Sequence, residues 1–596
     1  MAGQAMSISP APIRYVVHAH DLHAHQWRVV MTIPKPEAVQ TLQLPVWIPG
    51  SYMVREFSKQ MSSLTARQGN RVVLVKQTAK ATWEVQAQPN QALTLEYQVH
   101  AHDASVRTAW LDVNRGFFNP TSLCLMAVGH TDLPHVLNLV QPPDCPHWRV
   151  ATALKPIRTT RQGFGDYAAN DYDELADSPV QMADHWSGSF NIKGVPHQLV
   201  VTGAWPSFDG SRLLKDTQTI CETAIRFWHG GKKPAHDRYV FLLHAVEDGY
   251  GGLEHRHSTA LICKRGDLPA LHQTSTSEGY VSLLGLISHE YFHTWLVKRL
   301  RPATLTPYDY TQENYTDLLW LFEGFTSYYD DLLLCRAELI SPARYLQLLT
   351  KTIQGVLQTP GRKKQPLSQA SFEAWTKLYR PDANTPNLSV SYYAKGSLVA
   401  LCLDLSLRRS GHHLDEVMQA LWQHTRGGSV HERDLLQALK SVTGRAWHRE
   451  IKSWVHGTHD LPLQELLTEH GVEVLEDAPS LAQTLGLRVK ETHSVMVQTV
   501  LHGSPAHAAG FSPGDEWLGV SLTGQQSPSG SAWRLTQLNQ LPAIVGLRKK
   551  LIAWVARDGQ LTSLSLTLPQ KNQANLRLGI KDAKKVGRWL SGLSQT

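Results

Sequence analysis

Two histidines four residues apart, with a glutamate beside the first, are the residues of this chain with the most specific chemistry. They are His289, Glu290 and His293, in the pattern His-Glu-x-x-His. On a helix both imidazoles lie on one face and reach a single ion, while the carboxylate lies on a neighbouring flank. A zinc ion held there lowers the pKa of a water molecule to about 7, and the carboxylate takes its proton. The spacing therefore predicts a zinc site with Glu290 as general base.

A catalytic zinc ion needs a third protein ligand, and the sequence offers Glu323. The surrounding residues 316–329 are apolar on nearly every face, which predicts a buried helix. A buried glutamate is rare unless it is paired or binds a metal. We therefore expect His289, His293 and Glu323 to bind one Zn2+ per chain. Glu323 follows His293 by 30 residues (323 − 293), so residues 299–313 are expected to loop out.

The two histidines should lie on one helix. Ser275 and Glu278 have the Ser-x-x-Glu form of a capping box, and they precede a run from Tyr280 to Val297. The first proline signal after this run is Pro302. The sequence therefore predicts one helix over residues 280–297.

A glycine-rich bend lies shortly before that helix. Gly251, Gly252 and Glu254 stand between two predicted strands, residues 238–244 and 258–263. The glycines would let an extended peptide pair with the strand edge, and Glu254 would neutralise an ammonium group. An exopeptidase that recognises a free N-terminus needs such a site.

Composition excludes several classes of protein. The chain has 596 residues, enough for several domains, and a net charge of +7 with only 18% charged residues. No long block of lysine and arginine appears, so we expect no nucleic-acid partner. The N-terminus has no secretory pattern and no stretch approaches about eighteen apolar residues, so we expect no membrane segment. Six scattered cysteines favour free thiols in the cytoplasm.

The order of predicted elements suggests four regions. Residues 1–177 alternate in short apolar runs, as in an antiparallel β domain. Within it, Pro49-Gly50-Ser51-Tyr52 is interpreted as a tight turn, with a loop facing the active site as the alternative. Residues 178–462 mix strands and helices and should form the catalytic domain. Residues 463–572 form a further small domain, and residues 573–596 read as a polar, solvated tail.

The small C-terminal domain is similar to bacterial PDZ domains. The similarity rests on Gly503-Ser504-Pro505-Ala506 and on the Gly-Phe-x-Pro-Gly-Asp run that ends at Asp515. It implies that the loop at residues 485–487 offers backbone N–H groups to the C-terminal carboxylate of a peptide. Two roles stay open: binding a peptide, or packing on the catalytic domain and restricting its cleft.

The combined motifs resemble the gluzincin aminopeptidases. They are His-Glu-x-x-His, the Glu-Gly pair at Glu323, the Gly-Gly-Leu-Glu-His bend and Tyr393-Ala394-Lys395-Gly396. The extended string from His289 to Pro302 is similar to the glycyl aminopeptidase family in particular. The resemblance implies a multidomain α+β fold: an N-terminal antiparallel β domain, a thermolysin-like α/β catalytic domain with a helical lobe, and a C-terminal PDZ domain.

The same resemblance implies roles for the site residues. It supports zinc binding by the two histidines and Glu323, the base role of Glu290, and recognition of the substrate α-amine by Glu254. Tyr393 matches the tyrosine of the Tyr-x-Lys-Gly motif, whose hydroxyl would stabilise the oxyanion. Tyr392 is the alternative for that role.

The sequence thus predicts a zinc-dependent aminopeptidase that acts on peptides with a free N-terminus. Release of small residues, glycine and alanine, is implied by the resemblance alone. A zinc endopeptidase that recruits unfolded or exposed chains through its PDZ domain is the first alternative. The second is a PDZ scaffold with a relic zinc site. No oligomeric state is predicted.

Overall fold

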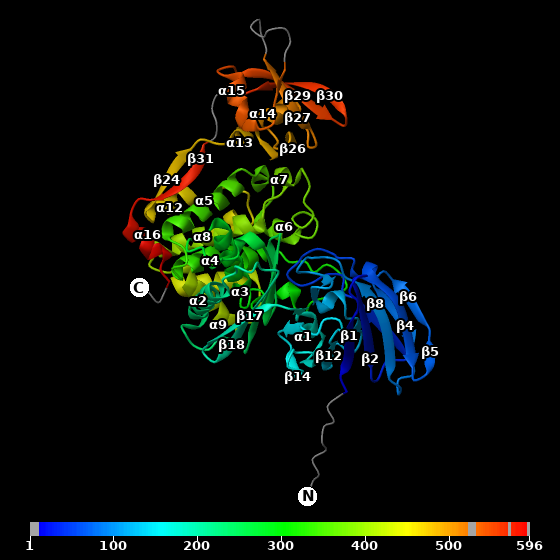
Figure 1. Cartoon of the computed structure of the whole chain (residues 1–596). Helices are drawn as coiled ribbons and strands as arrows, with labels where there is room; N and C mark the ends of the chain where they lie inside the picture. The colour runs from blue at the N-terminus through cyan, green and yellow to red at the C-terminus, as the bar shows by residue number, and fades with distance from the viewer. Residues whose placement is uncertain (1–10, 523–531, 570–573, 593–596) are drawn as a thin grey trace. The chain divides into compact units, whose positions relative to one another are not determined.

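The computed structural model describes residues 11–522, 532–569 and 574–592 (Figure 1). The chain divides into two compact units. The first holds residues up to Tyr315 with Tyr329–Leu339 and Leu421–His431, and the second holds Thr316–Tyr328, Ile340–Ala420 and residues from Glu432 on. Helix α4 (Leu319–Arg336) has residues in both units.

The first unit begins with the predicted β domain, drawn blue to cyan in Figure 1. Its largest sheet has the order β14-β15-β12-β1-β2-β8-β4-β5. These strands are β1 (Ile13–Asp21), β2 (Gln26–Ile33), β4 (Met61–Gln68), β5 (Arg71–Val73), β8 (Leu93–His100), β12 (His135–Val140), β14 (Lys155–Thr159) and β15 (Gly165–Ala169). The prediction of a purely antiparallel domain is wrong at one place, because β1 pairs with β12 in parallel. The long segment between these two strands allows the crossover that a parallel pair needs.

Two four-stranded sheets complete this domain, with the orders β13-β16-β10-β9 and β11-β3-β7-β6. Their strands are β3 (Val39–Gln43), β6 (Val75–Ala79), β7 (Thr82–Gln86), β9 (Ala109–Leu111), β10 (Arg115–Phe118), β11 (Met126–Ala127), β13 (Arg149–Thr152) and β16 (Val180–Ala183). Alternate residues of β8 are buried, as the period of a strand requires. Helix α1 (Tyr172–Ala176) lies close to the predicted end of the domain.

A five-stranded sheet of order β17-β18-β19-β21-β20 follows in the same unit. Its strands are β17 (Trp186–Ile192), β18 (Val195–Thr202), β19 (Tyr239–Val246), β20 (Gly251–Glu254) and β21 (Ser258–Lys264). Helices α2 (Gly210–His229) and α3 (Glu278–Phe292) pack against each other, and α3 also contacts β20 and β21. The predicted glycine-rich bend is therefore an edge strand beside the histidine helix.

Helix α3 is shorter than predicted. Its N-cap is Ser277, whose side chain accepts a hydrogen bond from the N–H of Tyr280, and not Ser275. It ends at Phe292 instead of Val297, with His293 as a helical C-cap. Val297 has a φ of 104°, a left-handed conformation that turns the chain away from the helix.

Residues 299–313 leave the helix pair α3 and α4, as predicted, and pack on the N-terminal β domain. Tyr310 is buried in the core of the N-terminal β domain. Trp47 of that domain donates from its indole nitrogen to the carbonyl of Asp309 at 2.7 Å. Aromatic residues within the insertion therefore anchor it on the β domain.

The second unit is mainly helical up to residue 469. Its helices are α5 (Pro342–Leu357), α6 (Leu367–Phe372), α7 (Thr385–Leu388), α8 (Tyr392–Arg408), α10 (Glu432–Thr443), α11 (His448–Trp454) and α12 (Leu463–Glu469), while α9 (Leu414–Thr425) has residues in both units. No helix in the described ranges is both long and apolar enough to cross a membrane.

A β-rich body with its own apolar core follows α12. It contains β25 (Leu487–Glu491), β26 (Val495–Val500), β27 (Glu516–Leu522), β28 (Trp533–Arg534), β29 (Lys550–Arg557) and β30 (Gln560–Thr567), with α13 (Leu481–Leu485), α14 (Pro505–Ala509) and α15 (Leu541–Val545). Strands β29 and β30 pair antiparallel and are joined by the turn at Asp558 and Gly559. That this body is a PDZ domain remains a prediction.

The prediction of a solvated tail is wrong for residues 574–592. Strand β31 (Asn575–Ile580) pairs antiparallel with β24 (Val472–Asp477), and helix α16 (Ala583–Leu590) follows. Val586, Trp589 and Leu590 are buried. Their i, i+3, i+4 spacing is that of one apolar helix face. The average composition of the tail is polar and does not reveal this face.

Helix α16 joins two longer helices of the second unit. The indole nitrogen of Trp589 lies 3.5 Å from the hydroxyl of Tyr328 on α4, and this hydroxyl donates to Asp404 of α8 at 2.7 Å. Arg408 also donates to Asp404, at 3.1 Å, and to the carbonyl of Arg588, at 2.8 Å. The C-terminal helix therefore helps to fix α4 relative to α8.

We expect Trp589→Ala to lower the free energy of unfolding by about 3–5 kcal/mol, because it empties a fully buried indole site. Trp533→Ala is the control, since that side chain is 61% exposed and its loss should cost within about 0.5 kcal/mol. Guanidinium unfolding followed by circular dichroism compares the two. Equal midpoints would show that α16 is not an anchor.

Candidate metal centre and active site

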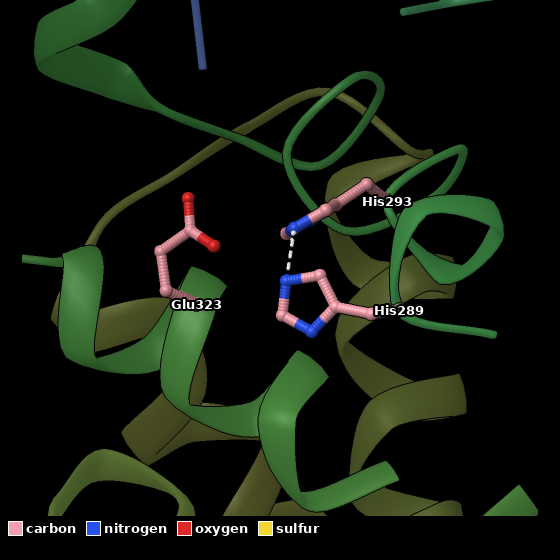
Figure 2. A group of neighbouring side chains, drawn as sticks. All are labelled: His289, His293 and Glu323. Carbon is pink, nitrogen blue, oxygen red and sulfur yellow. Dashed lines mark hydrogen bonds between the residues drawn. The ribbon is translucent and has the colours of Figure 1, made fainter. Parts of the chain in front are cut away.

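The three predicted zinc ligands come together. The ligand atoms of His289, His293 and Glu323 all lie within 4.8 Å of one another (Figure 2). Figure 2 shows the three side chains converging on one space, the histidines from α3 and its C-cap and the glutamate from α4. His293 keeps a helical backbone, so the i, i+4 stacking survives although the helix has ended.

The outer nitrogen of each imidazole is held by an acceptor. Nδ1 of His289 lies 3.0 Å from a carboxylate oxygen of Asp330, and Nδ1 of His293 lies 2.8 Å from the carbonyl oxygen of Leu296. Carboxylate and carbonyl oxygens accept hydrogen bonds, so both Nδ1 atoms donate. The lone pair of each ring is then on Nε2, the atom that faces the shared space.

The two Nε2 atoms lie 3.1 Å apart. Two lone pairs this close repel unless a positive charge, a proton or a metal ion, lies between them. Two nitrogens bound to one tetrahedral zinc at about 2.05 Å would be roughly 3.3 Å apart. The donor set and its spacing therefore fit a zinc ion.

The contacts of Asp330 with α3 also determine the position of Glu323. The two acids are seven residues apart on α4 and so share one face of that helix. Asp330 is fixed to α3 by His289 and by its carbonyl, which accepts from the hydroxyl of Ser288 at 2.9 Å. The register of α4 against α3 thus places Glu323, which is 2% exposed. Sequence reasoning missed Asp330, although its spacing from Glu323 was a usable signal.

Two glycines let α4 and α8 touch beside the site. A Cβ on Gly324 would lie 2.6 Å from the backbone of Gly396, and one on Gly396 would lie 2.7 Å from the carbonyl of Trp320. Real Cβ atoms do not approach backbone so closely, so both positions require glycine. This contact brings the first turn of α8, which carries Tyr393, next to Glu323.

The two candidate oxyanion tyrosines differ in accessibility. Tyr392 is fully buried, whereas Tyr393 is partly exposed, with its hydroxyl 3.2 Å from that of Tyr379. Burial, followed by the charge of Glu323, raises the pKa of Tyr393 well above its usual range. Its hydroxyl therefore stays protonated and able to donate. Accessibility favours Tyr393.

The predicted base rests on the glycine-rich strand. A Cβ on Gly252 would lie 2.1 Å from a carboxylate oxygen of Glu290. A side chain at this position would displace that carboxylate, which is buried. The predicted base and the edge strand β20 are therefore in direct contact.

Glu254, two residues further along β20, is 4% exposed. Within the described residues its Oε1 has no hydrogen-bond partner. The nearby ammonium of Lys298 already donates to Asp177 at 3.0 Å. Burial by itself lowers the pKa of Lys298, but the carboxylates of Asp177 and Glu254 raise it overall. A buried acid with an unfilled oxygen suits a cationic ligand.

Comparison with known proteins shows the family of the chain. Residues 14–184 match the Peptidase M61 N-terminal domain, and residues 282–399 match the M61 glycyl aminopeptidase family. A crystal structure of an aminopeptidase N family protein from Idiomarina loihiensis is 36% identical, with a TM-score of 0.91 over 97% of this chain and 100% of that one. The chain belongs to the M61 glycyl aminopeptidase family. As an M61 peptidase it is a zinc aminopeptidase.

Other solved structures are more distant. An M1 zinc metallopeptidase from Deinococcus radiodurans is 14% identical, with a TM-score of 0.47 over 76% of this chain and 95% of that one. A variant of it bound to a Tyr-Ser-Ala substrate is 15% identical, with the same score and coverage. We draw no conclusion about the M61 chain from these two structures. Among curated proteins none matches the sequence.

We expect Asp330→Asn to weaken zinc binding about 10–100-fold, because the carboxylate orients His289 and strengthens its ring as a ligand. Titration of the purified M61 enzyme against a competing chelator measures this affinity. Asp184→Asn removes the same charge at a side chain that is 74% exposed and should leave zinc binding unchanged. Equal affinities in both variants would mean that His289 needs no such orientation.

Proposed function

We propose that this peptidase releases small N-terminal residues, glycine and alanine, from peptides in a zinc-dependent reaction. The observation that carries the proposal is a buried acid with an unfilled oxygen, Glu254, on the strand that also contacts the predicted base Glu290. The glycyl description of the matching family supports the preference for glycine. Discrimination of a free N-terminus then follows from the charge of one carboxylate.

His289, His293 and Glu323 would hold one zinc ion per chain. When bound, zinc supplies Lewis-acid chemistry, which lowers the pKa of water and polarises the scissile carbonyl. Glu290 accepts a proton from the attacking water and delivers it to the leaving amine. Its contact with Gly252 keeps this carboxylate beside the edge strand, along which the peptide would run.

Substrate binding rests on β20. This strand lies at the edge of its sheet, so an extended peptide can add to it. Gly251 and Gly252 leave space for the peptide backbone, and the Glu254 carboxylate binds the α-ammonium group. The distance from that group to the base sets how many residues are released.

Tyr393 would donate its hydroxyl to the oxyanion that forms at the attacked carbonyl. Its partial exposure and its place beside Glu323 support this role. Tyr392 is fully buried, so its ring supports the start of α8.

We also propose that the β-rich body from α13 to β30, within the predicted region 463–572, is a PDZ domain that takes the C-terminal carboxylate of a peptide. Strand β24 lies in that region too, but it pairs with β31 instead. Strand β25 lies at a sheet edge, where a peptide strand can pair. Gly486, with a φ of 71°, ends α13 and leads into β25. A pocket of about 660 Å3 opens there, lined by Gly486, Leu487 and the basic side chains of Lys364 and Arg488. The basic lining suits a carboxylate.

We further propose that the protein works in the cytoplasm. All six cysteines are free, and five of them are buried. Free thiols persist where the surroundings are reducing.

We expect Glu254→Ala to lower kcat/KM for a glycyl chromogenic substrate about 10–150-fold, the value of a lost charge-assisted hydrogen bond of roughly 1.5–3 kcal/mol. Glu247→Ala is the control, because that side chain is 92% exposed and lies just before the same strand. Unchanged activity in Glu254→Ala would refute the amine-binding role. Cleavage of an N-acetylated peptide by the unaltered enzyme would instead favour the endopeptidase alternative.

We expect Tyr393→Phe to lower kcat about 100–1000-fold while the zinc content stays at one ion per chain, because the variant loses an oxyanion donor. Tyr392→Phe should change kcat far less. Single-turnover kinetics with the same substrate, paired with metal analysis, tests both. The opposite ranking would assign the oxyanion to Tyr392.

A further inference from the structure

A turn of the N-terminal β domain touches the acid proposed to bind the substrate amine. Gly50 has a φ of 96°, and a Cβ built on it would lie 2.4 and 2.5 Å from the two carboxylate oxygens of Glu254. The positive φ favours glycine at this position, and a Cβ there would displace the carboxylate of Glu254. The turn at Pro49–Tyr52 is thus also a surface that faces the site.

This turn is held in place on several sides. The N–H of Ser51 donates to the carbonyl of Ile48 at 3.0 Å, and Arg55 donates to the hydroxyl of Ser51 at 2.8 Å. The neighbouring Trp47 is anchored by its hydrogen bond to Asp309. Ile48, Ser51 and Tyr52 are all at most 1% exposed. Because the turn is held by these contacts, a Cβ added at Gly50 would move the carboxylate of Glu254 and not the turn.

One apolar core joins the turn to the strand that carries Glu254. Ile48, two residues before Gly50, and Leu253, next to Glu254, belong to the same buried cluster. Val106 of the β domain and Val240 of the catalytic sheet are in this cluster too. The separation between Gly50 and Glu254 is therefore set by close packing on both sides.

The β domain makes a second contact with the same strand. Arg107 donates from its guanidinium to the carbonyl of Gly252 at 3.0 Å. Gly252 is the residue on which Glu290 rests. The β domain thus holds β20 at the residue beside the base and at the residue that carries the amine-binding acid.

We propose that Gly50 is a positioning residue for the peptidase reaction: it holds the carboxylate of Glu254, and with it the substrate ammonium, at a fixed place relative to Glu290. The N-terminal β domain is then part of the active site and not an appendage. This inference rests on the proposed amine-binding role of Glu254. It predicts that a single methyl group added to the β domain disturbs recognition of the substrate's N-terminus.

The first test compares Gly50→Ala with Gly129→Ala in the full-length zinc enzyme. Gly129 lies in the same domain and has a φ of 84°, but a Cβ there meets nothing within 4 Å. Both variants place alanine at a positive φ, and their unfolding midpoints and zinc contents show whether they are folded alike. We expect KM for a glycyl chromogenic substrate to rise at least about tenfold in Gly50→Ala with a smaller change in kcat, and to stay within twofold in Gly129→Ala.

The second test is a double-mutant cycle with Glu254→Asp, which withdraws the carboxylate by one methylene. If Gly50 acts by holding this carboxylate, the double variant is at least about threefold more active than the product of the two single effects predicts. Strict additivity, or equal KM values in Gly50→Ala and Gly129→Ala, would overturn the inference. If Glu254→Ala were fully active, the proposed function itself would fail. If Glu254→Ala were inactive and Gly50→Ala normal, only the role of Gly50 would fail.

Discussion

The site depends on two imidazole lone pairs that face each other. Each ring has its Nδ1 committed to an acceptor, Asp330 for His289 and Leu296 for His293, so both Nε2 atoms point at one spot 3.1 Å apart. Such an arrangement is unfavourable without a positive charge between the rings. It exists because helix α3, the turn that follows it and helix α4 each supply one restraint. The metal centre is therefore a property of how these segments pack, and the zinc ion would stabilise the packing that creates it.

Close approaches at glycine connect this centre to the rest of the active site. Gly252 receives the carboxylate of Glu290, Gly50 receives that of Glu254, and Gly324 meets Gly396 where α4 crosses α8. At the first two places a side chain would displace a carboxylate, and at the third it would push α4 and α8 apart. Such displacements are costly for catalysis, because reacting groups must be held closely. The small size of these glycines therefore sets the positions of the neighbouring groups.

Much of the site could be predicted because its signals are local. The spacing of His289 and His293 and the apolar surroundings of Glu323 are visible in short stretches of sequence. Arg107 could not be found in this way, since its role comes from a contact with Gly252, which lies far from it in the chain. The spacing of Asp330 from Glu323 was a usable local signal, and the turn that contains Gly50 had a loop facing the active site as its alternative interpretation. The end of α3 was misplaced because a left-handed Val297 has no sequence signature. The helix α16 was not predicted because its segment is polar on average, although Val586, Trp589 and Leu590 form one apolar face.

Selection of a free N-terminus can be understood as a matter of desolvation. Burial alone would raise the pKa of Asp177, but Lys298 and His255 outweigh this and lower it, so the one nearby lysine is firmly paired. Within the described residues, Oε1 of Glu254 has no hydrogen-bond partner. In the role proposed for Glu254, a substrate ammonium would offset the cost of burying that charge, whereas a blocked amine would not offset it and would add bulk. The same carboxylate would then attract one class of peptide and reject the other, without a large pocket.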